Sequence, residues 1–192
     1  TIGVMEAFGA HISVHPADDF EIAGEGYRAA DLAIEPDASA ASYFFAAAAI
    51  TGGRVRIEGL GSASAQGDVH FVDALEAMGA SVTRERDATE VRGTGVLHGV
   101  DLDFGEISDT AQTLAAVAVF ADQPTTVRGI GFIRAKETDR VAAVVTELLR
   151  CGIRAEEIDD GFVIHPGTPQ PAVIHTYDDH RMAMSFALLG LR

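Results

Sequence analysis

The sequence predicts an α+β fold made of pseudo-symmetric β-α-β-α-β-β repeats, with buried helices and mixed sheets. Aspartates that open apolar runs recur at spacings of 72 and 70 residues, at Asp37, Asp109 and Asp179. Glycines that end amphipathic patterns recur at spacings of 70 and 73 residues, at Gly9, Gly79 and Gly152. Two independent markers with nearly one period indicate a structural repeat. The run after Asp37 is apolar on nearly all sides, which is typical of a buried helix.

The first complete repeat is predicted over residues 33–100. A short strand at Leu32–Ile34 leads to Asp37, whose carboxylate can cap the helix that follows. Gly52 and Gly53 end this helix. The remaining predicted elements are a strand at Val55–Ile57, an amphipathic helix at Val69–Met78 and two strands at Ser81–Glu85 and Glu90–Arg92.

The second repeat is predicted over residues 101–171, and residues 172–192 begin a further one. Its clearest part is a hairpin, in which strands at Ile153–Ile158 and Phe162–His165 flank the turn Asp159-Asp160-Gly161. Asp-Gly is a strong signal for a two-residue hairpin turn. Asp109 opens the buried helix of this repeat, and Asp179 opens the corresponding helix of the next.

Composition restricts the partners. The formal net charge of −15 over 192 residues disfavours nucleic acid and anionic membranes. The apolar stretch Tyr43–Ile50 is too short to span a bilayer. A single cysteine excludes an internal disulfide and indicates a reducing compartment, so we expect a cytoplasmic protein. An anionic substrate would need a few basic residues to reverse the local field.

Lys136 is the first candidate for such a basic residue, because it is the only lysine in the chain. It lies in the mixed-charge run Arg134–Arg140, directly before an apolar helical pattern. Lysine can move a proton, whereas arginine is a fixed fork for phosphate and carboxylate. Lys136 and Arg140 are expected one helical turn apart on one helix face. This spacing predicts an anion site.

Three phrases carry a family resemblance: Asp-Ala-Ser-Ala-Ala-Ser-Tyr-Phe from Asp37, Lys-Glu-Thr-Asp-Arg from Lys136, and Asp-His-Arg-Met-Ala-Met from Asp179. With the Gly/Ser-rich stretch Gly59–Gly67, they resemble the EPSP synthases among the enolpyruvyl transferases. The resemblance covers essentially the whole chain. It implies six β-α-β-α-β-β units in two lobes, with residues 1–32 ending the N-terminal lobe and 33–192 forming most of the C-terminal lobe.

The resemblance implies that the enolpyruvyl group of phosphoenolpyruvate is transferred to the 5-hydroxyl of shikimate 3-phosphate by addition and elimination. The products are EPSP and phosphate, on the route to chorismate and the aromatic amino acids. No cofactor and no metal are implied. A complete enzyme of this family would be a little over twice this length, so the chain by itself is expected to be inactive and to need the rest of the same polypeptide.

The resemblance also implies roles for individual residues. Catalysis falls to Asp109 as the base and to Glu137 with Lys136 as proton donors, and Asp109 and Lys136 also contact shikimate 3-phosphate. Arg140 and Arg181 bind phosphoenolpyruvate. The residues that flank Arg181 are expected to support it: Asp179 and His180. A substrate contact that is usually asparagine in the family is Phe132 here.

Each of these assignments has an ordinary structural alternative. Asp109 at a helix start is more commonly a cap. Lys136 and Glu137 could form a solvated ion-pair cluster, and a glutamate beside a lysine stays ionised unless burial raises its pKa. Arg181 in a first helical turn opposes the helix dipole, but an anion bound there would remove the conflict.

Two other functions fit parts of the pattern. An RNA 3'-terminal phosphate cyclase shares related repeats, but the charge of −15 disfavours a polyanion. A non-catalytic repeat scaffold would show an exposed apolar patch and scattered charges. The enolpyruvyl transferase interpretation instead predicts that four residues converge: Asp109, Lys136, Arg140 and Arg181.

Overall fold

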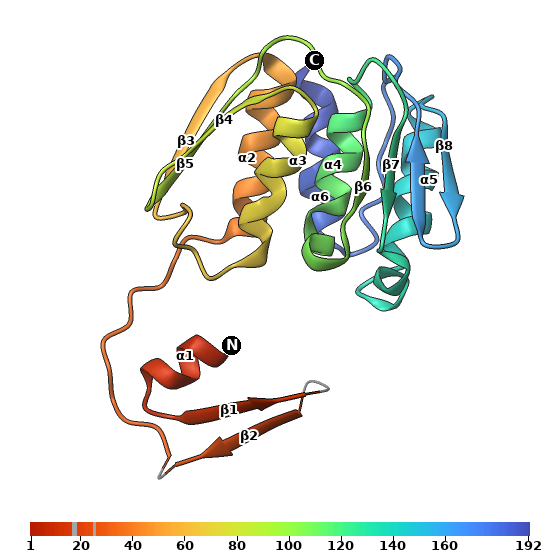
Figure 1. The fold of residues 1–192 in the computed structure, drawn as a ribbon. Helices are drawn as coiled ribbons and strands as arrows, with labels where there is room; N and C mark the ends of the chain where they lie inside the picture. Colours follow the sequence, from red (N-terminus) through yellow and green to blue (C-terminus); the bar gives the residue numbers. More distant parts are fainter. Residues whose placement is uncertain (17–18, 25) are drawn as a thin grey trace. The chain divides into compact units, whose positions relative to one another are not determined.

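The computed structural model describes residues 1–16, 19–24 and 26–192. The chain divides into two compact units, Thr1–Glu35 and Pro36–Arg192, which are coloured along the sequence in Figure 1. The predicted segment 1–32 includes residues 17, 18 and 25, which lie outside the described residues. Its assignment to one lobe, and that of residues 33–192 to another, stays a prediction.

The smaller unit is a helix followed by a hairpin. Helix α1 (Ile2–Ala7) is followed by Gly9, whose φ of 91° turns the chain back. Strands β1 (His11–His15) and β2 (Asp19–Ala23) pair antiparallel, with His11 opposite Ala23. Both strands are largely exposed, so this unit contributes little core of its own.

From its first helix onward, the first repeat of the larger unit follows the predicted order. Asp37 accepts a hydrogen bond from the backbone of Ala40 at 3.0 Å and caps α2 (Ala38–Thr51), and Gly52 ends the helix with a φ of 72°. A 3-10 helix at Gly67–His70 precedes α3. The other elements are β3 (Arg54–Glu58), α3 (Phe71–Ala77), β4 (Ser81–Arg84) and β5 (Ala88–Arg92), and the strands form an antiparallel sheet in the order β3-β5-β4.

The second repeat adds a strand to the same plan. Its elements are β6 (Asp101–Asp103), α4 (Ala111–Ala118), β7 (Thr125–Arg128), α5 (Arg140–Arg150), β8 (Ala155–Ile158) and β9 (Gly161–Ile164), and α6 (His180–Ala187) follows. The sheet order is β6-β7-β9-β8, with β6 parallel to β7 and the other pairs antiparallel. The hairpin predicted around Asp159-Asp160-Gly161 is therefore confirmed.

The two sheets match except at one edge. Strands β7, β9 and β8 repeat the order of β3, β5 and β4, and β6 is the additional strand. Its counterpart would be the strand predicted at Leu32–Ile34, and that prediction is wrong. The segment pairs with no described strand, and Ile34 is 89% exposed. A short apolar stretch becomes a strand only when a neighbour takes its backbone hydrogen bonds, and here none does.

Helices α2, α4 and α6 run side by side between the two sheets (Figure 1). Buried hydroxyls join them: the Ser42 and Thr113 oxygens lie 3.1 Å apart, and the Thr113 and Ser185 oxygens lie 3.4 Å apart. These three residues occupy neighbouring positions in successive repeats, four to six residues after each marker aspartate. The link therefore holds the three helices in a common register.

None of the helices among the described residues combines the length and the apolar character that a bilayer crossing would require.

Replacing Leu114 by alanine should test the inner-helix core. Leu114 on α4 is fully buried, so Leu114→Ala should lower the free energy of unfolding by about 2–5 kcal/mol. The matched control is Leu149→Ala on α5, where the side chain is 54% exposed and the loss should stay below about 1 kcal/mol. Urea unfolding of both variants measures the difference, and equal losses would contradict the predicted core.

Candidate active site

Three segments distant in sequence bring four predicted site residues together around one carboxylate. Lys136 Nζ lies 2.5 Å from Asp109 Oδ1, and Arg140 Nη1 lies 3.2 Å from the same oxygen. Arg181 Nη2 donates to Asp109 Oδ2 at 2.8 Å. We call Asp109, Lys136, Arg140 and Arg181 the Asp109 cluster. A scaffold with scattered charges would lack this convergence.

Asp109 is not a helix cap, although its sequence position suggested one. It lies in a 3-10 helix, Gly105–Thr110, that is kinked at Ile107, and α4 begins only at Ala111. Residue Thr110 precedes α4 without a capping hydrogen bond from its side chain. The extra turn frees the Asp109 carboxylate from the helix end, and it faces the three cations instead.

Lys136 is also not where the spacing placed it. Helix α5 begins at Arg140, and Asp139 caps it by accepting from the backbone of Ala142 at 2.9 Å. Lys136 ends a 3-10 helix at Gly131–Ala135, with a ψ of −148°. The prediction that Lys136 and Arg140 share a helix face is therefore wrong. They reach the same carboxylate because the loop folds back over the helix start.

The ring of Phe132 lies beneath the ammonium group of the cluster. Lys136 Nζ is 5.7 Å from the ring centroid, within the range of a cation–π contact. Phe132 itself is 55% exposed. The position where the family usually has asparagine therefore offers Lys136 an aromatic face and no hydrogen bond.

Arg140 is almost completely buried and all its guanidinium nitrogens are engaged. Its side chain is 1% exposed. Its Nε donates to Asp179 Oδ2 at 2.7 Å, and its Nη2 lies 3.4 Å from Asp179 Oδ1 and 2.7 Å from Glu137 Oε2. Because Nη1 faces Asp109, a ligand anion can form a paired contact with this guanidinium only by replacing one of the carboxylates.

Arg181 bends from the first turn of α6 toward Asp109. Its Nη1 donates to the backbone carbonyl of Asp109 at 3.3 Å, and its side chain is 14% exposed. Its Nε is buried and has no hydrogen-bond partner among the described residues. The unfavourable placement of a cation at a helix N-terminus is offset by two carboxylates: Asp109, and Asp179, which caps α6 by accepting from the Arg181 backbone at 2.8 Å.

The other predicted residues hold different places. Glu137 is bound to Arg140 at the edge of the cluster, and its side chain is 53% exposed. Asp179 is completely buried and joins the cluster through Arg140. His180 is exposed and takes no part in the hydrogen bonds that connect the described residues of the cluster. The placement of Asp179 is thus consistent with a supporting role, whereas His180 makes no hydrogen bond to the described residues of the cluster.

The cations determine the protonation of the two central aspartates. Burial alone would raise the pKa of Asp109, but the hydrogen bond from Lys136 and the charges of Arg181, Lys136 and Arg140 hold it below its usual value. Burial opposes ionisation of Asp179 as well, and the hydrogen bonds from Arg140 and the Arg181 backbone again lower its pKa. Both carboxylates are therefore ionised, and Asp109 is a weak base while its cations remain in place.

Sequence reasoning missed two neighbours of the cluster. Asp68 accepts a hydrogen bond from the Ser39 hydroxyl, and its pKa is raised chiefly by burial and further by the charge of Asp109. The hydroxyl of Tyr43 is buried without a partner among the described residues, and burial raises its pKa although the charge of Arg181 opposes this. Ser39 and Tyr43 both lie in the phrase that opens at Asp37, which was the available signal.

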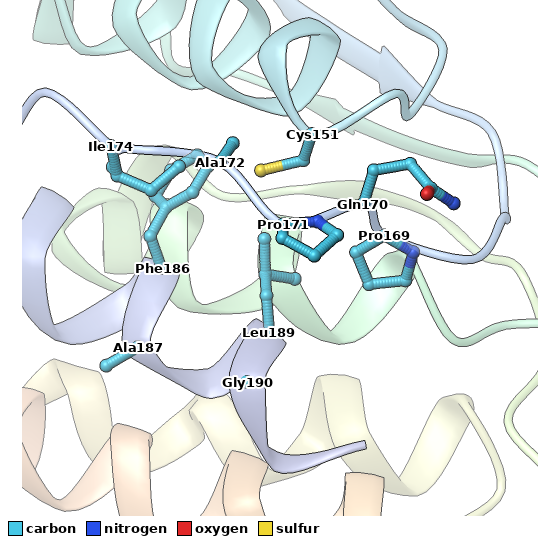
Figure 2. Close-up of a pocket in the computed structure, with 10 residues that line it drawn as sticks. All are labelled: Cys151, Pro169, Gln170, Pro171, Ala172, Ile174, Phe186, Ala187, Leu189 and Gly190. Carbon is cyan, nitrogen blue, oxygen red and sulfur yellow. The ribbon is translucent and has the colours of Figure 1, made fainter.

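A separate cavity shows what the site is not. A space of about 410 Å³ is lined by Cys151, by residues 169–174 and by the C-terminal part of α6, as Figure 2 shows. Its lining residues include no charged side chain and none of the Asp109 cluster. Cys151 is buried there, and burial raises the pKa of its thiol. An anionic substrate has no counter-charge in this cavity, so the cluster remains the candidate site.

Comparisons with known proteins identify the family of the chain. The family model for EPSP synthase (3-phosphoshikimate 1-carboxyvinyltransferase) matches residues 1–192. A 3-phosphoshikimate 1-carboxyvinyltransferase of Nostoc punctiforme is 51% identical over 193 residues, which is 100% of this chain and 45% of that protein. Another, from Methanoculleus marisnigri, is 46% identical over 192 residues, covering 100% of this chain and 46% of that protein.

The fold agrees as well. A solved EPSP synthase from Acinetobacter baumannii superimposes with a TM-score of 0.80 at 26% identity, over 98% of this chain and 46% of that one. This chain belongs to the EPSP synthase family, and the predicted resemblance and α+β fold are confirmed. It spans less than half the length of the relatives it matches.

The buried Arg140–Asp179 pair should be a strong contributor to stability. Asp179→Ala leaves a buried guanidinium short of a carboxylate, so it should lower the free energy of unfolding by about 3–5 kcal/mol. Asp37→Ala is the matched control, because Asp37 caps α2 but pairs with no buried arginine, and its loss should be about 1 kcal/mol. Denaturant unfolding distinguishes the two, and similar values would show that capping alone accounts for Asp179.

The same pair should make stability depend on pH at the acid end. A carboxylate whose pKa is lowered on folding stabilises the native state above its unfolded pKa of about 3.9 and loses this contribution as the pH falls through the folded value. Stability should thus be level above pH ~5 and should fall below pH ~4. Asp179→Asn should reduce this fall, because its amide does not titrate. An unchanged acid slope in the variant, measured by unfolding at several pH values, would contradict the assignment.

Proposed function

We propose that the protein which carries this chain transfers the enolpyruvyl group of phosphoenolpyruvate to the 5-hydroxyl of shikimate 3-phosphate. The observation that carries the proposal is the contact of one partly exposed carboxylate, Asp109, with three cations from separate segments. Such a group can bind anions and accept a proton at the same place. Membership of the EPSP synthase family supports this chemistry over the other functions that the repeats allow.

Phosphoenolpyruvate is expected to bind between Arg140 and Arg181. Guanidinium groups bind phosphate and carboxylate through paired hydrogen bonds. Arg140 must first release a carboxylate, and Glu137 is the one most easily replaced, because its side chain is 53% exposed whereas Asp179 is completely buried. Binding would thereby free Glu137 to turn toward the substrate. Once it has left Arg140 and taken up a proton from water, it can donate that proton to the methylene carbon.

Asp109 then serves as the base. The phosphates and carboxylate of the substrates compete for Lys136 and Arg181, and a carboxylate that loses cationic partners regains its basicity. In the addition step the 5-oxygen bonds to carbon 2 of phosphoenolpyruvate, Asp109 takes the hydroxyl proton, and the methylene becomes a methyl group. In the elimination step that methyl group returns a proton to the Glu137 carboxylate and the carbon–oxygen bond to phosphate breaks. The leaving phosphate takes the proton held by Asp109, and EPSP and phosphate are released.

Lys136 has two parts in this scheme. It contacts shikimate 3-phosphate as a compact charge, and it can share the proton donation with Glu137, since an ammonium group exchanges protons and a guanidinium group does not. With the matching relatives more than twice as long as this chain, we infer that the rest of the polypeptide completes the substrate cleft. Residues 1–192 alone should then show no turnover.

A chimera tests the proposal directly. Residues 1–192 replace the matching segment of the Nostoc punctiforme relative, which is 51% identical, and phosphate release is measured with both substrates present. Asp109→Asn should lower kcat by roughly 10²–10⁴-fold, since the base is lost. Arg181→Gln should lower kcat/KM for phosphoenolpyruvate by roughly 10–100-fold, the effect of losing a hydrogen bond to a charged group.

The control is Arg86→Gln, a cation whose side chain is 85% exposed and which lies outside the cluster. It should leave both constants unchanged. Normal turnover in Asp109→Asn would remove that residue from the mechanism. A folded but inactive parent chimera would count against the proposed function as a whole.

A further inference from the structure

Glu147 is a fully buried carboxylate that the proposed chemistry does not use. It lies on α5 and accepts hydrogen bonds from three residues: from the Tyr177 hydroxyl at 2.8 Å, from the His175 backbone at 3.1 Å, and from Arg150 through Nε at 2.9 Å and Nη2 at 3.5 Å. Burying a charge is costly unless it is paired and hydrogen-bonded. Burial by itself would raise the pKa of Glu147. The hydrogen bonds from Tyr177, His175 and Arg150 lower it below its usual value, so the group is ionised.

One of the three donors, Tyr177, lies within a strained turn, and another, His175, directly precedes it. Asp179 donates its backbone N–H to the Thr176 carbonyl at 2.9 Å, and the two residues between them have positive φ, 56° at Tyr177 and 54° at Asp178. This pattern is that of a type I′ turn, which glycine and asparagine favour. Aspartate tolerates the left-handed region, but tyrosine does so at a cost. The turn therefore persists only because contacts such as those to Glu147 hold it.

The turn delivers two residues to the Asp109 cluster. Asp179, directly after it, binds Arg140 and caps α6, and Arg181 follows two residues later and binds Asp109. Helix α5 thus holds this segment at two points. Arg140, the first residue of α5, binds Asp179 at the end of the turn. Glu147 binds His175 before the turn and Tyr177 within it. These two residues are seven apart, which places them on one face of the helix.

We propose that Glu147 is a positioning residue, which holds the 176–179 turn through Tyr177 and His175 so that Arg181 meets Asp109. As a role in catalysis this rests on the proposed function. As a statement about the geometry of the cluster it does not. The Glu147 carboxylate is linked to the reacting groups only through intervening residues. It therefore acts on them through the turn.

The rotation of the Arg181 guanidinium group, measured by nitrogen NMR on the 192-residue chain, reports on this geometry without turnover. Its hydrogen bonds to Asp109 slow the rotation. The Asp109→Asn variant gives the rotation rate of Arg181 when its hydrogen bonds to residue 109 are weakened. Tyr177→Phe and Glu147→Gln should speed the rotation at least about fivefold, the factor equivalent to the ~1 kcal/mol of one lost hydrogen bond.

Two controls separate positioning from general destabilisation. Val145→Ala removes buried volume from the same helix, and Arg150→Gln removes the Glu147 partner that does not belong to the turn. Both should leave the Arg181 rotation unchanged, with urea unfolding used to compare their stability with that of the test variants.

The outcomes are distinct. If Tyr177→Phe and Glu147→Gln destabilise the chain but leave the Arg181 rotation at the wild-type rate, Glu147 is only structural and the proposal is overturned. Equal acceleration by Val145→Ala would overturn it as well, and so would an unchanged rate in Asp109→Asn. An inactive chimera together with the predicted rotation rates would refute the proposed function and leave the positioning role standing.

Discussion

The buried pair between Arg140 and Asp179 is the interaction on which the rest of the site depends. It joins the start of α5 to the start of α6 across 39 residues of sequence, and neither side chain is more than 1% exposed. Two charges withdrawn from water are costly unless every donor is satisfied. Here the backbone of Arg181 and the carboxylates of Asp109 and Glu137 complete the network. The pair therefore holds the starts of both helices together, and the cluster residues at those starts are positioned with them.

A second constraint follows from charge balance. The chain is strongly negative, yet the cluster and its attached carboxylates are neutral, with three cations set against Asp109, Glu137 and Asp179. Under the proposed function, a substrate anion would therefore bind by exchange with these carboxylates. Exposure ranks the carboxylates for that exchange, from 53% at Glu137 through 33% at Asp109 to 0% at Asp179. The two more exposed carboxylates are the ones to which the proposed function assigns proton transfer, and the buried one holds α5 to α6.

Much of the fold was predictable because its signals are local. Asp37 and Gly52 bound α2 as expected, since capping and left-handed glycine act within a few residues. The positions of Asp109 and Lys136 were predicted less well. An extra 3-10 turn precedes α4, and a loop rather than a helix carries Lys136. Both deviations are sustained by contacts between residues far apart in sequence, which periodicity cannot report. The family resemblance selected four residues that converge in the structure, whereas their mutual geometry required tertiary structure.

The repeat explains why so few residues suffice to make a site. Helices α2, α4 and α6 run in the same direction (Figure 1), and the hydroxyls of Ser42, Thr113 and Ser185 keep them in register. Their N-terminal ends therefore lie together, and whatever precedes each helix is delivered to one place. Asp37 and Asp179 use that position to cap, whereas an additional turn before α4 leaves the Asp109 carboxylate free of the helix end. A single inserted turn in one of three equivalent modules is enough to convert a structural aspartate into one that faces three cations.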